Sequence, residues 1–256
     1  MNIQMPVDFG KHLYHFTQAE TALLYILPSL QLKLSSPLHT NDPQENKTFG
    51  SWHVFDEFDS FGEIPVKKDF NSFLKDSCRI LCFSEDYEIH EGSVWYTEGF
   101  KHPTMWAHYA DRFKGVCLVF YKEILLKNLH NKDCVTEKVN YQPYLPFPAV
   151  SKEKYEHEGK EYISKYFREH ASELFFTKYI HWAPEDEYRI LCFDGSRHIN
   201  IRDSLAGIYY GYDINQNLLS LLRKYAQDLG CWLEQVSLYS GLFQATPDEQ
   251  IFRDNA

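Results

Sequence analysis

Three short apolar runs constrain the fold of this chain more than any other feature of its sequence. They read RILCFS at 79–84, GVCLVF at 115–120 and EYRILCF at 187–193. Runs of this length without polar alternation are typical of strands buried inside a sheet. Helical patterns occur between such runs but do not alternate with them regularly, so we expect an α+β fold. We expect one domain over residues 1–256, with mixed or antiparallel sheets and flanking helices.

Further elements follow from local patterns. Leu13–Phe16 is predicted to be a strand, and Thr17 with Glu20 resembles a capping box at the start of the next helix. Pro28 is predicted to close this helix. Other predictions are a strand through Leu30–Leu34, a turn at 41–43, partial loop at 44–75, helices at 102–113 and 151–178, strands at 136–142 and near 208–212, a helix capped by DINQ at 213–216 and ended by Gly230, and a terminal hairpin.

Charge and composition exclude several protein classes. The chain carries 36 acidic and 26 basic residues, a net charge of −10, which argues against a broad nucleic-acid footprint. No apolar stretch reaches the length of a membrane span, and no signal peptide is recognisable. The six cysteines lie mostly in apolar runs, so we expect reduced thiols in a cytoplasmic protein. Cys78 and Cys82 lack a second pair at zinc spacing, so no metal site is predicted.

Three sets of residues could carry chemistry. His15 and Thr17 lie two apart on a strand and would present a ring nitrogen and a hydroxyl on one side. The alternatives are a satisfied core histidine and a helix cap. Trp106 and Tyr109 lie three apart on a helix and could form a stacking wall, with Ser84 at the end of the preceding strand. The alternative is aromatic packing onto the sheet.

The third set is Glu185, Glu187 and Arg189, which alternate at the start of an apolar strand. In a strand their side chains share one face, either as a surface ladder or at the mouth of a cleft. A carboxylate at such a mouth could stabilise positive charge that develops on a sugar carbon during cleavage of a glycosidic bond.

The order of several segments resembles a bacterial family called Domain of Unknown Function 2971. The segments are LYHFT, LSSPLHTNDPQE, ILCFS, MWAHYADRFKGVCLVF, KYIHWAPEDEYRIL and GIYYGYDI, and the similarity covers about residues 12–245. The family name supplies no activity.

The same series is similar to the core of NAD-dependent ADP-ribosyltransferases. His15 and Thr17 match a His-x-Ser/Thr strand, Tyr109 matches a tyrosine presented after the second strand, and Glu187 or Glu185 matches the glutamate strand. The resemblance implies that His15 and Thr17 hold the ribose and nicotinamide region. It further implies that Tyr109 stacks on nicotinamide and that Glu187 stabilises the oxocarbenium-like state.

The resulting expectation is an NAD-dependent ADP-ribosyltransferase or NAD glycohydrolase, with NAD as substrate and an unidentified acceptor macromolecule or water. Ser84, Trp106 and Arg189 complete the predicted nucleotide cleft, and a toxin or antiphage role would fit this activity. Two alternatives remain open. One is a non-enzymatic protein that binds a nucleotide or peptide in the same cleft, and the other is a metal-dependent nuclease that uses Glu185, Glu187 and His15.

Overall fold

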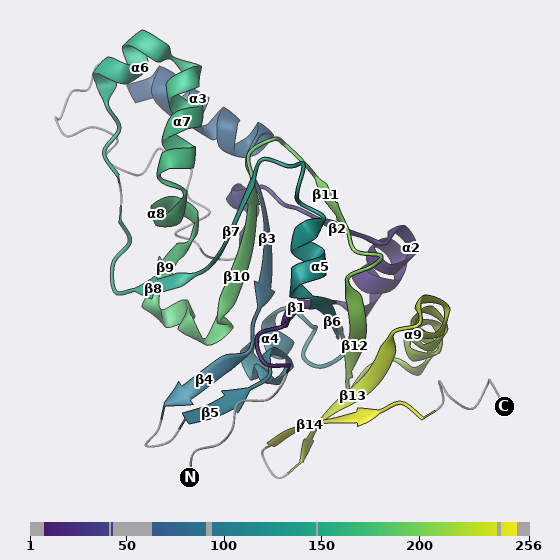
Figure 1. The fold of residues 1–256 in the computed structure, drawn as a ribbon. Helices are drawn as coiled ribbons and strands as arrows, with labels where there is room; N and C mark the ends of the chain where they lie inside the picture. Colours follow the sequence, from purple (N-terminus) through teal and green to yellow (C-terminus); the bar gives the residue numbers. More distant parts are fainter. Residues whose placement is uncertain are drawn as a thin grey trace.

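The computed structural model describes residues 8–40, 42, 63–90, 94–146, 148–239 and 242–249. Within this part of the chain, the largest element is an eight-stranded mixed sheet in the order β14-β13-β12-β6-β1-β3-β10-β7 (Figure 1). Its strands are β1 His12–Thr17, β3 Arg79–Ser84, β6 Val116–Tyr121, β7 Cys134–Lys138, β10 Glu187–Cys192, β12 Leu205–Gly211, β13 Trp232–Tyr239 and β14 Leu242–Pro247. The three apolar runs form β3, β6 and β10, as the sequence predicts.

Neighbouring strands of this sheet run antiparallel except β12 and β13, which pair in parallel. The crossover between that parallel pair is helix α9, Gln216–Leu229. The side chain of Asn215 caps α9 by accepting the Asn217 amide N–H, and Gly230 ends it at φ 66°. This confirms the predicted helix boundaries, and β13 and β14 confirm the terminal hairpin.

Three two-stranded sheets accompany the large one. They are β2 Gln31–Lys33 with β11 His198–Asn200, β4 Tyr87–His90 with β5 Val94–Thr97, and β8 Asn140–Gln142 with β9 Thr177–Tyr179. The remaining helical segments are α1 Ala19–Thr21, η1 Ala22–Ile26, α2 Leu27–Ser29, η2 Pro37–His39, α3 Glu63–Asp76, η3 Gly99–Lys101, α4 Pro103–His108, α5 Lys122–Lys127, α6 Lys152–Glu158, α7 Lys160–Glu169, α8 Ala171–Phe175 and η4 Ile180–Glu185.

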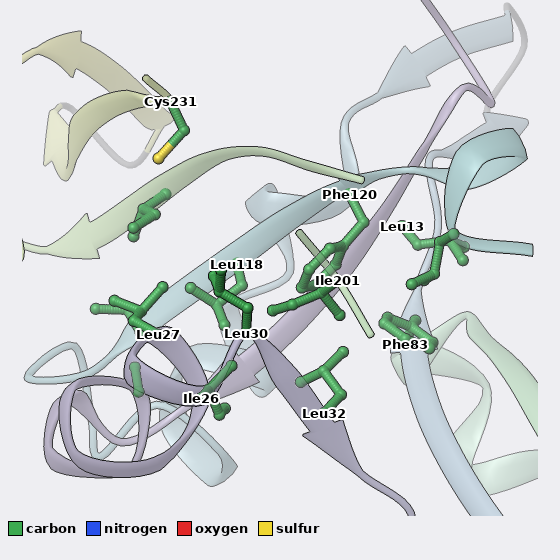
Figure 2. Packing of buried hydrophobic residues seen from close by; sticks show 14 of the residues in the cluster. Leu13, Ile26, Leu27, Leu30, Leu32, Phe83, Leu118, Phe120, Ile201 and Cys231 are labelled. Atoms are coloured by element: carbon green, nitrogen blue, oxygen red, sulfur yellow. The ribbon is translucent and has the colours of Figure 1, made fainter. Parts of the chain in front are cut away.

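The two faces of the large sheet pack against different helices because strand residues alternate sides. On one face, residues such as Leu13, Leu118 and Phe120 pack against the 19–30 helical segment and α9 (Figure 2). On the other face, Tyr14 and Phe16 pack against α4. A third cluster joins α3, α7 and α8 to the far end of β10.

The predicted helix at 151–178 is wrong in its continuity. Gly159 at φ 58° separates α6 from α7, a second break at His170 separates α7 from α8, and residues 177–179 form strand β9. The predicted apolar stripe is nevertheless buried in α7, at Tyr162, Ile163, Tyr166 and Phe167. The spacing of apolar residues predicts which face of a helix is buried. It does not predict a break in the helix when the apolar residues on both sides of the break are still buried.

Two helix-end predictions near the N-terminus also need correction. Thr17 belongs to β1, and the helix starts after Gln18 without a side-chain cap. Pro28 lies inside the last helical turn, which ends at Leu30 with φ 51°. The predicted turn at 41–43 lies mostly outside the described residues.

The prediction of six free thiols is wrong for one pair. Cys134 on β7 and Cys192 on β10 form a disulfide, and the other four cysteines are free. The strand register places these two residues directly opposite each other, with Cα atoms 4.0 Å apart. An apolar run shows that a thiol will be buried, but it does not show which residue will face it across the sheet.

No helix in the described part of the chain combines the length and apolar character needed to span a bilayer.

Candidate functional site

A cavity of about 300 Å³ opens between β1 and β3. The two strands pair at Tyr14 and Ser84, and no further register pair joins them within the described chain. Consecutive residues of both strands line the cavity, Tyr14–Phe16 on one and Ile80–Phe83 on the other. Because successive strand residues point to opposite faces, this lining shows that the cavity lies in a gap between diverging strands rather than on one face.

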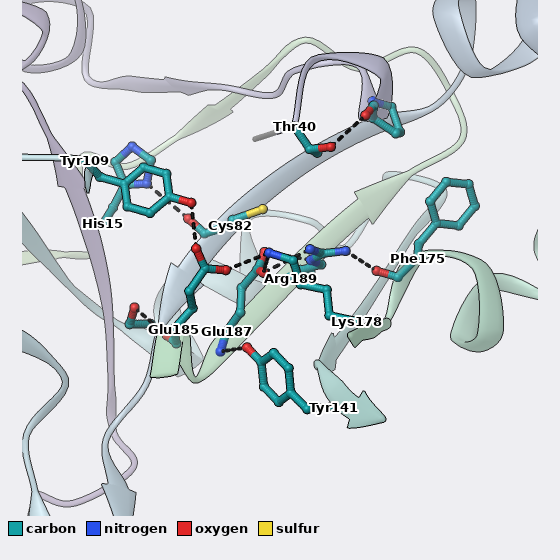
Figure 3. A network of polar contacts seen from close by, with 12 residues as sticks. His15, Thr40, Cys82, Tyr109, Tyr141, Phe175, Lys178, Glu185, Glu187 and Arg189 are labelled. Carbon is teal, nitrogen blue, oxygen red and sulfur yellow. Dashed lines mark hydrogen bonds and ion pairs between the residues drawn. The ribbon is translucent and has the colours of Figure 1, made fainter. Parts of the chain in front are cut away.

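Four charged side chains line this cavity and contact one another, and we call them the ionic quartet: Lys178, Glu185, Glu187 and Arg189 (Figure 3). They come from β9, η4 and the start of β10. All four are at least 94% buried. Lys178 joins the two carboxylates, with its Nζ 2.6 Å from Glu185 Oε2 and 3.0 Å from Glu187 Oε2.

Arg189 holds the other side of Glu187. Its Nε donates to Glu187 Oε1 at 2.6 Å and its second terminal nitrogen donates to Oε2 at 2.9 Å, while the first donates to the carbonyl of Phe175. The Glu187 amide N–H donates to the Tyr141 hydroxyl at 2.9 Å. Both oxygens of Glu187 are therefore occupied by cations, which fixes this carboxylate in one orientation.

The charges within the ionic quartet balance, since two carboxylates face one ammonium and one guanidinium. Burial alone would raise the pKa of Glu187, but Arg189 and Lys178 outweigh it and hold the pKa of that carboxyl well below its usual range. Burial and the nearby Glu187 raise the pKa of the Cys82 thiol well above normal. Cys82 is therefore a neutral thiol and not a nucleophile at neutral pH.

Tyr109 and His15 form the opposite wall of the cavity. The Tyr109 hydroxyl donates to Glu185 Oε1 at 2.7 Å, so Glu185 lies between Tyr109 and Lys178 (Figure 3). His15 Nδ1 lies 3.1 Å from the Cys82 carbonyl oxygen, which can only accept, so Nδ1 carries the proton. Burial lowers the pKa of His15 and keeps the ring neutral. Its Nε2 is then a hydrogen-bond acceptor.

The structure thus brings five of the predicted site residues to one cavity: His15, Tyr109, Glu185, Glu187 and Arg189. The predicted shared strand face is only partly right. Glu187 and Arg189 lie on β10, but Glu185 ends η4, and Asp186 between them has φ 42°. Lys178, rather than strand alternation, brings Glu185 next to Glu187.

Three predicted residues do not line the cavity. Thr17 pairs with Val116 near the end of β1. Ser84 is fully buried, and its hydroxyl donates to the carbonyl of Glu185 at 3.0 Å, so it supports the backbone of that residue. Trp106 is also fully buried, and its indole N–H donates to the Phe100 carbonyl at 2.7 Å. Trp106 therefore forms no wall with Tyr109, because its ring packs on Phe16 and Phe113.

Sequence reasoning missed Lys178 and four residues near the cavity entrance: Lys33, Ser35, His39 and Thr40. Lys178 lies in the segment KYIHWAPEDEYRIL and most of the other four lie in LSSPLHTNDPQE, but no spacing within these segments distinguishes them. No group of three His, Cys, Asp or Glu side chains in the described chain is arranged to hold a metal ion. The geometry therefore gives the metal-dependent nuclease no support.

Comparison with known proteins identifies a family match over part of the chain. Residues 105–190 match the model of a family described as protein of unknown function (DUF2971). The matched stretch includes Tyr109 and the ionic quartet, whereas His15 and the entrance residues lie outside it. No curated protein and no solved structure matches the chain.

Proposed function

We propose that this cavity binds NAD and cleaves the bond between nicotinamide and ribose, passing ADP-ribose to an acceptor macromolecule or to water. The observation that carries the proposal is that His15 on β1, Tyr109 at the end of α4, Glu185 on η4 and Glu187 on β10 all line one cavity. The resemblance to ADP-ribosyltransferases selects these residues and Thr17 from three distant segments of the sequence, and only Thr17 lies outside the cavity.

The size and lining of the cavity suit the reactive end of NAD. A volume of about 300 Å³ lies at the small end of ligand pockets, so it fits a nicotinamide ribosyl group while the rest of the dinucleotide extends through the entrance. Phe16, Phe83 and Met105 supply apolar surface, and the Tyr109 ring can pack against nicotinamide. His15 Nε2 can accept a hydrogen bond from a ribose hydroxyl.

The reaction breaks the bond from ribose C1′ to the nicotinamide nitrogen. The bonding electron pair leaves with the pyridinium, which becomes neutral nicotinamide, and positive charge develops on C1′ and the ring oxygen. Water or an acceptor nucleophile then bonds to C1′ and releases a proton. A carboxylate beside C1′ lowers the barrier because its attraction to this charge is stronger in the transition state than in the ground state.

The contacts favour Glu185 over Glu187 as this carboxylate. Glu185 faces Tyr109 and has one cation partner, whereas both oxygens of Glu187 are held by Arg189 and Lys178. Two cations cancel much of the field of Glu187. We therefore assign Glu187 as a positioning residue that fixes Lys178 and Arg189, which reverses the order of the pair that the sequence favoured.

The test is nicotinamide release from NAD by the purified protein, compared with Glu185→Gln, Glu187→Gln and the exposed control Glu123→Gln. Glu185→Gln should lose about 100-fold or more in rate, the scale for one preorganised electrostatic group. Its melting temperature should fall less than that of Glu187→Gln, because Lys178 and Arg189 both keep Glu187 as a partner. Glu187→Gln should lower the melting temperature, because Arg189 loses a buried partner. Glu123→Gln should behave as wild type.

The outcomes separate the possibilities clearly. A larger rate loss in a fully folded Glu187→Gln would return the catalytic role to Glu187. NAD binding without nicotinamide release, in the presence of candidate acceptors, would leave a nucleotide-binding protein. Absence of both NAD binding and nicotinamide release in the wild-type protein would overturn the proposal.

A further inference from the structure

The entrance of the cavity is formed by a short segment that the catalytic proposal does not use. Lys33 ends β2, Ser35 follows it, and His39 and Thr40 lie at the end of η2. All four residues line the same cavity as the ionic quartet. In the view of Figure 3, Thr40 and Tyr141 lie on opposite sides of the network. We call these four residues the entrance rim.

The backbone holds the entrance rim in a fixed position. Ser35 forms an isolated β-bridge with Ile80 on β3. The Ser35 amide donates to the Ile80 carbonyl with an N···O distance of 2.9 Å, and the Ile80 amide donates to the Ser35 carbonyl at 2.7 Å. The buried Ser36 hydroxyl donates to the Leu74 carbonyl and accepts from the Leu38 amide. Because Ser35 is tied to the strand that lines the cavity, the backbone of the rim is held in place before any ligand arrives.

The described side chains that line the cavity carry a net charge of +1, from three cations and two carboxylates. The ionic quartet sums to zero because each of its carboxylates is paired with a cation. Lys33 is exposed and is the one cation of this described lining that lies outside the neutral quartet. This local positive charge contrasts with the net charge of −10 on the whole chain. The described lining of the cavity therefore favours an anionic ligand.

We propose that the entrance rim binds the phosphate groups of the nucleotide whose other end occupies the cavity. This inference rests on the proposed function for the identity of the nucleotide. Lys33 supplies a point charge, while the Ser35 hydroxyl and the His39 ring can donate hydrogen bonds to phosphate oxygens. The Thr40 hydroxyl already donates to the Pro37 carbonyl at 3.1 Å, so Thr40 only borders the site. The rim lies at the entrance and Glu185 lies within, so the site selects a dinucleotide over a nucleoside fragment that lacks phosphate.

Isothermal titration calorimetry tests this with NAD, ADP-ribose, nicotinamide riboside and inorganic pyrophosphate. The variant is Lys33→Gln, and the control is Lys224→Gln, an exposed lysine on α9 that makes the same change in net charge. Lys33→Gln should weaken NAD and ADP-ribose binding about 5- to 10-fold, the scale of one charge-assisted contact at a partly exposed site. Nicotinamide riboside binding should not change, and Lys224→Gln should match wild type.

Raising sodium chloride from 50 to 200 mM should weaken ADP-ribose binding more in the wild-type protein than in Lys33→Gln, because salt screens the Lys33 charge. Equal ADP-ribose affinity in wild type and Lys33→Gln would overturn the entrance rim while leaving NAD cleavage in place. Lys33-dependent binding of pyrophosphate without binding of NAD or ADP-ribose would support the rim and refute the proposed function. Binding of none of the four compounds would refute both.

Discussion

Replacing Lys178 by methionine tests the ionic quartet without reference to any activity. Lys178 is 4% exposed, and its Nζ lies 2.6 Å from Glu185 and 3.0 Å from Glu187. Methionine retains much of the apolar stem but removes the charge. Glu187 keeps Arg189, whereas Glu185 is left with the neutral Tyr109 hydroxyl. The variant therefore contains a buried carboxylate that has lost its cation.

Removing one partner of a buried ion pair costs about 3–5 kcal/mol. In a chain of this size, each 1 kcal/mol shifts the melting temperature by about 2–4 °C, so we expect a fall of about 6–20 °C at neutral pH. The exposed control Lys127→Met, whose Nζ lies 2.7 Å from Glu123, should cost about 0.5 kcal/mol or less.

The stability that Lys178→Met loses should decrease as the pH is lowered. A buried carboxylate without a cation is costly only while it is ionised, so the destabilisation should be larger at high pH and smaller at low pH. Thermal melts at pH 8 and pH 5 should show a smaller gap from wild type at pH 5.

A second substitution checks the cause. Adding Glu185→Gln to Lys178→Met removes the uncompensated charge and should recover much of the lost stability at pH 8. The reasoning is refuted if Lys178→Met destabilises no more than Lys127→Met at both pH values, or if Glu185→Gln makes the double variant worse.

Two further predictions concern the scaffold. Gly211→Ala should destabilise the protein by about 1–3 kcal/mol or more in chemical denaturation, because its Cβ would lie 2.0 Å from the Phe113 carbonyl oxygen; wild-type stability would contradict this close approach. Thiol titration of the denatured protein should find four free thiols before reduction and six after it, because Cys134 and Cys192 are bonded; six before reduction would rule out the disulfide.

The central strands were predictable because their sequence pattern and their environment agree. RILCFS, GVCLVF and EYRILCF are buried on both sides, and continuous apolar runs are typical of such strands. The breaks at Gly159 and His170 were not predicted, because the apolar stripe continues past them. The pairing of Cys134 with Cys192 depends on strand register, which local patterns do not determine.

In the candidate site too, some residues were predicted from the sequence and others were not. His15, Tyr109 and the two glutamates were selected by the order of short segments. Lys178 was missed because a lone lysine near an apolar strand has no distinctive spacing. Only the three-dimensional arrangement of β9, η4 and β10 places Lys178 between Glu185 and Glu187. Trp106 was predicted to line the site because of its aromatic ring, but the ring is packed in the hydrophobic core.

The central position of β1 has a consequence for how the protein is made. This strand is the first of the large sheet along the chain, yet its neighbours β3 and β6 follow far behind it. His15 meets Cys82 across 67 residues, and the glutamates arrive a further hundred residues later. At about 5–20 residues per second, the ribosome needs roughly 10–30 s to progress from Thr17 to Arg189. Throughout that interval a nascent chain contains β1 but no complete cavity, so it cannot yet bind a ligand there.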